Sequence, residues 1–373
     1  MFFCVSCGEP LDSEGGLNFS HFHRVTSDCR LFGPGGQVLH CDSCGLVQRP
    51  RSRRWGEDCT EIYLDYQAHR QGRGEEQKVF NSSLCQSRSD GLISHLSEKF
   101  RIGDHASWLD YGCGEGHFLE SLSHHCPDVT LSGCDHTSEI PQRLRNQDRI
   151  KYFPVGSSFR AHFDWISLIH VVEHFHDPRN ELRRIQQLLK PGGRIFIQVP
   201  DLRRNPFDLI IADHGSFFTR STMCQLLQDS GLDVEFCSDD WVRKELSIVA
   251  TQRTDTKHIT SLKRVEEPQR LLEHHLKFLT SLKSEIRFKK KEKITIFGSS
   301  IAATWAAAEG GLENVHEFLD EDSSRQNSKH LGVPVKKPTP GLQNVIIPLD
   351  LSKELILFYL LQKLKSYLQI KKQ

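Results

Sequence analysis

The stretch from 107 to 135 constrains the fold of this chain more than any other. It contains a short apolar run that reaches Asp110, then a turn with glycine at every second position, Gly112, Gly114 and Gly116, and then a segment with apolar residues at helical spacing. Glycine adopts backbone conformations with positive φ that other residues rarely reach, so these glycines predict a tight turn between a strand and a helix. This order is typical of α/β folds.

The same alternation continues along the chain. We expect further strands within 129–135, 163–174, 192–200 and 245–251, and helices within 81–100, 178–190 and 221–230. Strands that alternate with helices predict a parallel sheet with helices on both faces. After a long polar helix over about 256–290, the segment 293–311 repeats the strand, glycine turn and helix. It is followed by strands within 314–322, 331–335 and 344–350 and by a final helix after Asp350.

These patterns divide the chain into three parts. Residues 1–75 form a small loop-rich module with little helical periodicity, residues 76–255 form a Rossmann-like α/β core, and residues 256–373 form a second, smaller α/β domain. Each of the last two parts is long enough to bury a core of its own.

Two CxxC pairs mark the first module. Cys4 and Cys7 form one pair, and Cys41 and Cys44 form the other. Four thiolates at about 2.3 Å from one ion make a closed tetrahedral site of the structural kind. The pairs therefore predict a structural Zn²⁺ ion that stabilises a module with little core of its own. Free or redox-active thiols are the alternative interpretation.

Two acidic residues at the strand ends fit a cofactor with an adenosyl group. Asp135 follows the second strand about 20 residues after the glycines, where a carboxylate can accept hydrogen bonds from both ribose hydroxyls. Asp110 precedes the glycines and suits a ligand with a positive ammonium group. A glycine-rich turn alone also fits NAD-binding proteins, but the pattern here is GxGxG and not GxGxxG.

Residues 107–122 resemble motif I of the class I S-adenosylmethionine-dependent methyltransferases. His170–Pro178 is similar to the segment that follows a core strand in that superfamily, and Leu189–Gly193 resembles its LKPGG turn. The resemblance implies a Rossmann-like core that binds S-adenosylmethionine as co-substrate. The residues that would bind it are Asp110, Gly112, Gly114, Gly116, Asp135 and His170, with His170 on the methionine side.

The adenine side departs from the superfamily pattern. Many relatives carry an acid after the third strand, whereas this chain has Pro154–Ser158 there. We therefore expect the adenine to be contacted by Ser157, Ser158 or backbone groups.

The layout as a whole is similar to that of the nucleotide-sugar C-methyltransferases, which have a zinc-binding N-terminal domain and a characteristic C-terminal domain. Cys41–Gln48 is similar to their second knuckle, and Tyr63–Tyr66 stands where they have a Tyr-rich segment. Asp213–Thr219 resembles their His-Glu-His-x-x-x-Phe-Ser segment, and the pieces GSSIAAT, FLDED and LGVPV resemble their last domain. The resemblance implies methyl transfer to carbon of a nucleotide-linked keto-sugar.

Such a transfer requires a proton to leave the carbon beside a ketone before the enolate attacks the sulfonium methyl. Histidine, with a pKa near neutrality, suits this role. We expect His214 to be the base, with Asp213 nearby and with Tyr63 or Tyr66 donating to the sugar or enolate oxygen. The chain departs from the family pattern at Ala212, where a histidine is expected, and at Asp213, which replaces a glutamate. Local packing explains His214 and both tyrosines equally simply.

The composition limits the classes of binding partner that we expect for this protein. Lys and Arg number 48, as do Asp and Glu, so the formal net charge is zero. Zero charge gives no overall attraction to nucleic acid or to an anionic membrane. No apolar run approaches the ~20 residues of a membrane span, and the first residues do not resemble a secretory signal. We expect a cytoplasmic protein with a small-molecule substrate, and the composition favours no particular oligomeric state.

Rival functions remain open at this point. O- or N-methylation of another small molecule needs the same core. A zinc-ribbon RNA methyltransferase needs a basic face. One local cluster of arginines would fit such a face, but the same arginines also fit a clamp for a substrate diphosphate or a solvated loop. These arginines are Arg49, Arg51, Arg53 and Arg54. NAD-linked chemistry at Gly298–Ala302 and Asp320 lacks a complete glycine motif. A metal site of Glu173, His174 and His176 has no matching distal pair of ligands in the sequence.

Overall fold

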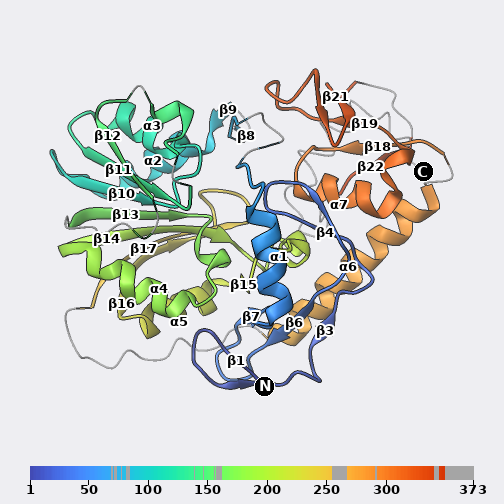
Figure 1. Cartoon of the computed structure of the whole chain (residues 1–373), viewed down its shortest axis with the longest axis horizontal. Coiled ribbons are helices and arrows are strands. Elements are labelled where there is room, and N and C mark those ends of the chain that lie inside the picture. Colours follow the sequence, from blue (N-terminus) through green and yellow to red (C-terminus); the bar gives the residue numbers. More distant parts are fainter. Residues whose placement is uncertain are drawn as a thin grey trace.

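The computed structural model describes residues 1–68, 70, 74–76, 78–80, 85–137, 139–145, 147–154, 156, 162–253, 267–289, 292–339 and 344–348. Its two largest sheets have seven and five strands. Figure 1 shows them on opposite sides of the molecule, with the N-terminal region and helix α1 between them. The predicted adenine contacts Ser157 and Ser158, and the helix expected after Asp350, lie outside the described residues.

The seven-stranded sheet forms the core expected from the glycine turn. Its strands are β10 (Ser107–Tyr111), β11 (Thr130–Asp135), β12 (Ile150–Pro154), β13 (Phe163–Ile169), β14 (Leu189–Pro200), β16 (Leu232–Ser238) and β17 (Glu245–Gln252). Their spatial order is β12-β11-β10-β13-β14-β17-β16. The order reverses between β10 and β13, and ligands of open α/β sheets bind at the carboxyl ends of strands on either side of such a point.

The prediction of an all-parallel sheet is wrong at one edge. Strand β17 pairs antiparallel with both β14 and β16, whereas the other pairings of this sheet are parallel. Only a short connection separates β16 from β17, and short connections favour antiparallel neighbours. Strands β12 and β16 were not predicted, because both are edge strands whose residues are mainly half-buried or exposed.

Helices cover both faces of this sheet, as the alternation predicts (Figure 1). They are α2 (Arg88–Lys99) and α3 (His117–His125) on one face and α4 (Pro178–Ile185) and α5 (Arg220–Asp229) on the other. The helix expected over 178–190 is shorter than predicted. It continues as a 3₁₀ turn over Gln186–Leu188, and Leu189 already pairs with Phe163 as the first residue of β14.

The N-terminal region contains a helix that the sequence did not predict, α1 (Arg53–Tyr63). Ser52 caps it by accepting from the backbone N–H of Trp55, and its buried face carries Trp55, Asp58 and Ile62. The Asp58 carboxylate lies 2.7 Å from the Arg24 guanidinium, and both side chains are buried. A buried, paired acid in the middle of the inward face breaks the apolar periodicity by which amphipathic helices are recognised.

A four-stranded sheet joins the N-terminal region to the core. It contains β3 (Leu17–Asn18), β6 (Gln37–His40), β7 (Val47–Gln48) and β15 (Ser216–Phe217) in the order β15-β7-β6-β3. Strand β15 follows β14 in the chain, so a segment from the core completes the N-terminal sheet. The remaining short pairs are β1 (Phe2–Phe3) with β2 (Pro10–Leu11), β4 (Arg24–Val25) with β5 (Leu31–Phe32), and β8 (Lys78–Phe80) with β9 (Cys85–Ser87).

The five-stranded sheet lies near the C-terminus. Its strands are β18 (Ile294–Phe297), β19 (Val315–Leu319), β20 (Ser328–His330), β21 (Val333–Lys336) and β22 (Val345–Ile346), in the order β20-β21-β19-β18-β22. Helices α6 (Pro268–Lys289) and α7 (Ile301–Gly310) accompany it, and α7 also contacts β4 and β5 of the N-terminal region. A strand thus forms within each of the four stretches predicted for this part.

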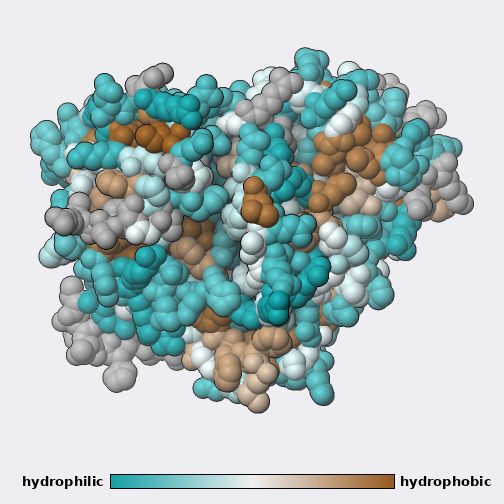
Figure 2. All heavy atoms as spheres, viewed as in Figure 1, coloured by the Kyte–Doolittle hydropathy of each residue, from teal (hydrophilic) through white to brown (hydrophobic). Residues whose placement is uncertain are grey.

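The apolar side chains gather in three buried clusters, and hydrophilic residues cover most of the face seen in Figure 2. Among the described residues, no helix is both long enough and apolar enough to cross a membrane.

Candidate functional site

The turn after β10 forms as its glycines predict. Gly112, Gly114 and Gly116 all have positive φ, at 82°, 51° and 85°. At Gly112 a Cβ atom would lie only 2.4 Å from the Cγ2 atom of Val171, so the turn also packs closely against the segment that follows β13. Gly116 is the N-terminal cap of α3. The turn therefore requires glycine for both its conformation and its packing.

Asp110 lies at the inner end of this turn. Its carboxylate is buried and accepts a hydrogen bond of 2.6 Å from the Ser167 hydroxyl. Burial raises the pKa of Asp110 to about 7, although the hydrogen bond from Ser167 acts in the opposite direction. A carboxyl group with this pKa gains stability in its charged form when a cation binds nearby.

Asp135 faces the same turn from the end of β11. One carboxylate oxygen accepts from the backbone N–H of Gly114 at 2.8 Å, and the other accepts from the backbone N–H of His136 at 2.7 Å. Burial opposes ionisation, but the imidazole of His136 and these hydrogen bonds lower the pKa of Asp135 overall. The residue is thus a charged acceptor at the edge where the two central strands end.

His170 ends β13 in a left-handed conformation, with φ of 54°. Its Nδ1 atom lies 3.1 Å from Glu173 and its Nε2 atom lies 3.2 Å from Glu245. Burial and the nearby Arg88 guanidinium oppose protonation, but the two carboxylates outweigh them and raise the pKa of His170 to about 9. The imidazole therefore carries positive charge at neutral pH, on the side of β10 opposite to Asp135.

The structure places His214 beside a second histidine, His174, which the sequence analysis considered only as a metal ligand. The rings of His174 and His214 meet edge to face with centroids 4.6 Å apart. Each ring has a buried carboxylate partner. Asp208 Oδ1 lies 2.6 Å from the Nδ1 atom of His214, and Asp213 Oδ2 lies 3.4 Å from the Nδ1 atom of His174. Of these residues, the sequence analysis proposed catalytic roles for Asp213 and His214 only.

Glu173 completes this cluster, which we call the histidine cluster: Glu173, His174, Asp208, Asp213 and His214. Glu173 is fully buried, and its Oε2 atom has no hydrogen-bond partner among the residues that the structure describes. One ligand atom from each of Glu173, His174 and His214 lies within 4.8 Å of the others. His176 is exposed and its ring lies beside that of Trp55, so it does not join them as one of the sequence alternatives supposed.

Two arginines, the buried Arg49 and the half-buried Arg51, hold the chain around His214. Arg49 donates to the backbone oxygens of His214 and Leu209, and Arg51 donates to those of Phe175 and Gly215. The interpretation as a solvated loop is therefore wrong for Arg49 and Arg51, because their guanidinium groups satisfy backbone carbonyls inside the protein, whereas Arg53 and Arg54 are exposed. Arg49 and Arg51 contribute no basic face of the kind that an RNA-binding protein needs.

The predicted tyrosines lie between the cofactor turn and the histidine cluster. The Tyr63 hydroxyl is 3.1 Å from the Nδ1 atom of His174, and the rings of Tyr63 and Tyr66 are 5.1 Å apart. Both rings also lie edge-on to His136, the neighbour of Asp135, at 5.3 and 6.1 Å. Burial raises the pKa of both phenols, so they are protonated hydrogen-bond donors at neutral pH.

The four predicted zinc ligands lie together. Cys4 and Cys44 have Sγ atoms 3.5 Å apart, as do Cys7 and Cys41, and all four sulfur atoms lie within 4.8 Å of one another. None of the four forms a disulfide. After each pair a glycine with positive φ donates its N–H back to the first cysteine's carbonyl, Gly8 to Cys4 and Gly45 to Cys41. Four free thiols in this arrangement fit a tetrahedral Zn²⁺ ion.

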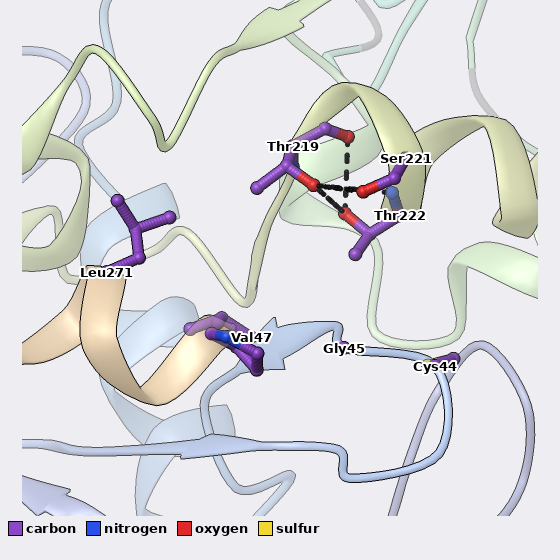
Figure 3. A pocket seen from close by; sticks show the side chains of 8 residues that line it. Cys44, Gly45, Val47, Thr219, Ser221, Thr222 and Leu271 are labelled. Atoms are coloured by element: carbon purple, nitrogen blue, oxygen red, sulfur yellow. Dashed lines mark hydrogen bonds between the residues drawn. The ribbon is translucent and has the colours of Figure 1, made fainter. Parts of the chain in front are cut away.

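A small pocket lies beside the second knuckle and away from the histidine cluster. It is lined by Cys44, Gly45, Val47, Thr219, Ser221, Thr222, Pro268 and Leu271. In Figure 3 the hydroxyl groups of Thr219, Ser221 and Thr222 bond to one another at the start of α5. These groups cap the helix, so the pocket offers no chemistry of its own.

Comparisons with known proteins agree with the core. Residues 84–235 match a family model described as a methyltransferase domain. A ubiquinone biosynthesis O-methyltransferase of Aeromonas salmonicida is 29% identical over 150 residues, 33% of this chain and 61% of that protein. Its counterpart from Nitrosospira multiformis is 25% identical over 151 residues, 34% of this chain and 62% of that protein. The chain thus spans less than two thirds of the length of these relatives.

Solved structures similar to the chain include the mitomycin 7-O-methyltransferase MmcR, at 19% identity and a TM-score of 0.39, covering 44% of this chain and 53% of that one. Another is a methyltransferase of calicheamicin biosynthesis in its SAH-bound form, at 18% identity and a TM-score of 0.36, covering 44% and 54%. The family match and the geometry of the glycine turn lead to one conclusion. Residues 84–235 of this chain form a class I S-adenosylmethionine-dependent methyltransferase domain.

Proposed function

We propose that the protein transfers the methyl group of S-adenosylmethionine to carbon of a nucleotide-linked keto-sugar. The observation that carries this proposal is the histidine cluster, which lies beside the cofactor turn and holds two imidazole–carboxylate pairs. Carbon acquires a nucleophilic electron pair only when a proton leaves, so a carbon acceptor needs a base of this kind at the site.

On the cofactor side, the proposal gives each residue a role that follows from its charge. Asp135 accepts from the ribose hydroxyls, and Asp110 stabilises the ammonium group of the methionine part. His170, positively charged between two acids, attracts the methionine carboxylate. Gly112, Gly114 and Gly116 let the backbone approach the ligand.

On the acceptor side, His214 takes the proton from the carbon beside the ketone. Asp213 lies next to it in the chain and pairs with His174. Tyr63 and Tyr66, both protonated, donate to the ketone oxygen as it becomes an enolate. The enolate carbon then attacks the sulfonium methyl group, which the domain holds in line.

The zinc module has a positioning role in this proposal. Cys4, Cys7, Cys41 and Cys44 bind one Zn²⁺ ion, which supplies folding energy and no chemistry. Strand β7, directly after the second knuckle, pairs with β15, directly after His214. The metal therefore fixes the segment that carries the base.

O-methylation of a phenolic or sugar hydroxyl is the second candidate, because the curated relatives named above are O-methyltransferases. The same base would remove a hydroxyl proton instead of a carbon-bound one. The two reactions differ in the acceptor and not in the cofactor side of the site.

The decisive experiment is an S-adenosylmethionine-dependent assay with nucleotide-linked keto-sugars, the corresponding reduced sugars and catechol-type phenols. We expect turnover with a keto-sugar and loss of roughly 10²–10⁴-fold in kcat in His214→Ala. His176→Ala is the matched control, because His176 is a nearby exposed histidine outside the cluster. Turnover with phenols alone would favour O-methylation. Full activity of His214→Ala would show that His214 is not the base.

A further inference from the structure

Among the described residues, Asp208 is the carboxylate within hydrogen-bond distance of the His214 ring, and nothing in the sequence pattern singles it out. It lies in the 3₁₀ turn Pro206–Ile210, is buried, and places Oδ1 2.6 Å from the Nδ1 atom of His214. Its other oxygen has no hydrogen-bond partner in the described structure. The imidazole partly compensates this buried carboxylate, but burial and the nearby Glu173 carboxylate still raise the pKa of Asp208 overall.

The turn that carries Asp208 is held rigidly from outside the methyltransferase domain. It packs against both α6 and α7, and Phe207 stacks edge to face on Phe278 and Trp305 at 5.8 Å each. The next residue, Leu209, accepts a hydrogen bond from the buried Arg49 through its backbone oxygen. Asp208 therefore has little freedom to move away from His214.

A carboxylate hydrogen-bonded to Nδ1 determines which ring nitrogen carries the proton in the neutral imidazole. It accepts a hydrogen bond from Nδ1–H and so leaves Nε2 as the bare, basic atom of the neutral ring. When Nε2 takes a proton, the same carboxylate stabilises the positive charge that forms on the ring. The other charged or titratable groups around His214 are Glu173, His174, Asp213 and Arg49.

We infer that Asp208 is a positioning residue that makes Nε2 of His214 the proton-accepting atom of the reaction. The inference rests on the proposed function for its chemical step. In that step the C–H bond of the acceptor breaks, its proton binds to Nε2 and its electron pair forms the C=C bond of the enolate, while the C=O π pair moves to the ketone oxygen. The enolate carbon then bonds to the methyl group, and the pair of the S–CH₃ bond stays on sulfur as a neutral thioether.

Kinetics of the full chain with S-adenosylmethionine test the inference. Asp208→Asn keeps the shape but loses the charge, and we expect kcat to fall roughly 10²–10³-fold while KM changes by less than about threefold. The acid limb of the pH–rate profile moves about one unit or more to lower pH, because the protonated ring loses its anionic partner. Asp208→Glu recovers part of kcat. Asp201→Asn removes an equally buried carboxylate that is bonded to Arg203, and it serves as the matched control.

A second measurement keeps this inference separate from the proposed function. With ¹⁵N-labelled histidine, the nitrogen shifts of the neutral His214 ring, assigned by comparison with His214→Gln, report which atom carries the proton. We expect Nδ1–H in the wild type and a mixed or reversed tautomer in Asp208→Asn, whatever acceptor the enzyme uses. A wild-type ring protonated on Nε2 overturns the inference. So does an Asp208→Asn variant whose kcat and pH profile match those of Asp201→Asn.

Discussion

The cofactor turn and the histidine cluster are two halves of one site that are built in opposite ways. The turn and its two acids come from one stretch, Ser107 to Asp135, whose strands pair directly with each other. The cluster combines segments near 173 and 208–214, and the buried side chains of Arg49 and Trp55 from the N-terminal region donate to backbone oxygens of the second segment. The first half therefore depends on neighbouring strands of the core sheet and the segment that follows β13, whereas the second half depends on the whole fold being in place.

Removal of the proposed metal ion should have the largest effect, and it tests whether the two halves of the site form independently. Structural Zn²⁺ binds small modules with an apparent free energy on the order of 10 kcal/mol or more, so Cys41→Ser should unfold the knuckles. We expect turnover to fall at least about 100-fold, because β7 no longer holds β15 and the segment with His214.

The affinity for S-adenosylmethionine should change by less than about tenfold in the same variant, since the turn does not depend on the knuckles. Metal analysis should give one zinc per chain in the wild type and in Cys59→Ser, and none in Cys41→Ser. Cys59 lies outside the thiol cluster and serves as the control. An equal loss of affinity and turnover would show that the two halves are not built independently.

A smaller effect is expected from the turn itself. Ala at Gly112 must adopt a φ of 82°, and its Cβ atom would overlap Val171. The left-handed conformation costs about 1–2 kcal/mol and overpacking about 1–3 kcal/mol, so Gly112→Ala should lower the free energy of unfolding by roughly 3 kcal/mol. Gly103→Ala is the control, because a Cβ atom there meets nothing within 4 Å. Equal midpoints of urea unfolding in the two variants would contradict the close packing of the turn.

The smallest effect is a pH dependence of stability. Burial raises the pKa of Asp110 to about 7 from the ordinary value near 3.8, so the folded protein binds this proton more tightly than the unfolded chain. Its contribution to stability is complete below pH 4 and is lost as the pH rises through 7.

Compared with Asp110→Asn, the wild type should therefore lose about 2 kcal/mol of unfolding free energy between pH 5 and pH 7. Urea unfolding at several pH values measures the difference between the two proteins. A difference that does not change with pH would mean that Asp110 is ionised over the whole range. It would contradict the proposal that a bound cation shifts Asp110 to its charged form.

What the sequence predicts follows the same division. The glycine turn, its flanking strand and helix, and the two CxxC knuckles depend on residues near one another in the chain, and all of them form. The pairing of His214 with Asp208, and its approach to His174, depend on where β14, the turn at 206–210 and α1 settle in space. No periodicity in the sequence contains that information.

Buried charges account for the other differences. Helix α1 was missed because its inward face includes Asp58, which is paired with Arg24. Arg49 and Arg51 suggested a solvated loop because arginine is mostly exposed, yet here they satisfy backbone carbonyls around the site. In each case a long-range partner that the sequence pattern does not reveal makes the buried polar residue possible.

The central claim is that the segment from Leu109 to Asp135 binds S-adenosylmethionine through bare backbone and two carboxylates. Isothermal titration calorimetry of the full chain with S-adenosylmethionine and with S-adenosylhomocysteine tests it most directly. We expect saturable binding of both at one site per chain, weakened roughly 10- to 100-fold in Asp135→Ala, which loses charge-assisted hydrogen bonds to the ribose. Absence of saturable binding by the folded wild type, or unchanged affinity in Asp135→Ala, would contradict the account.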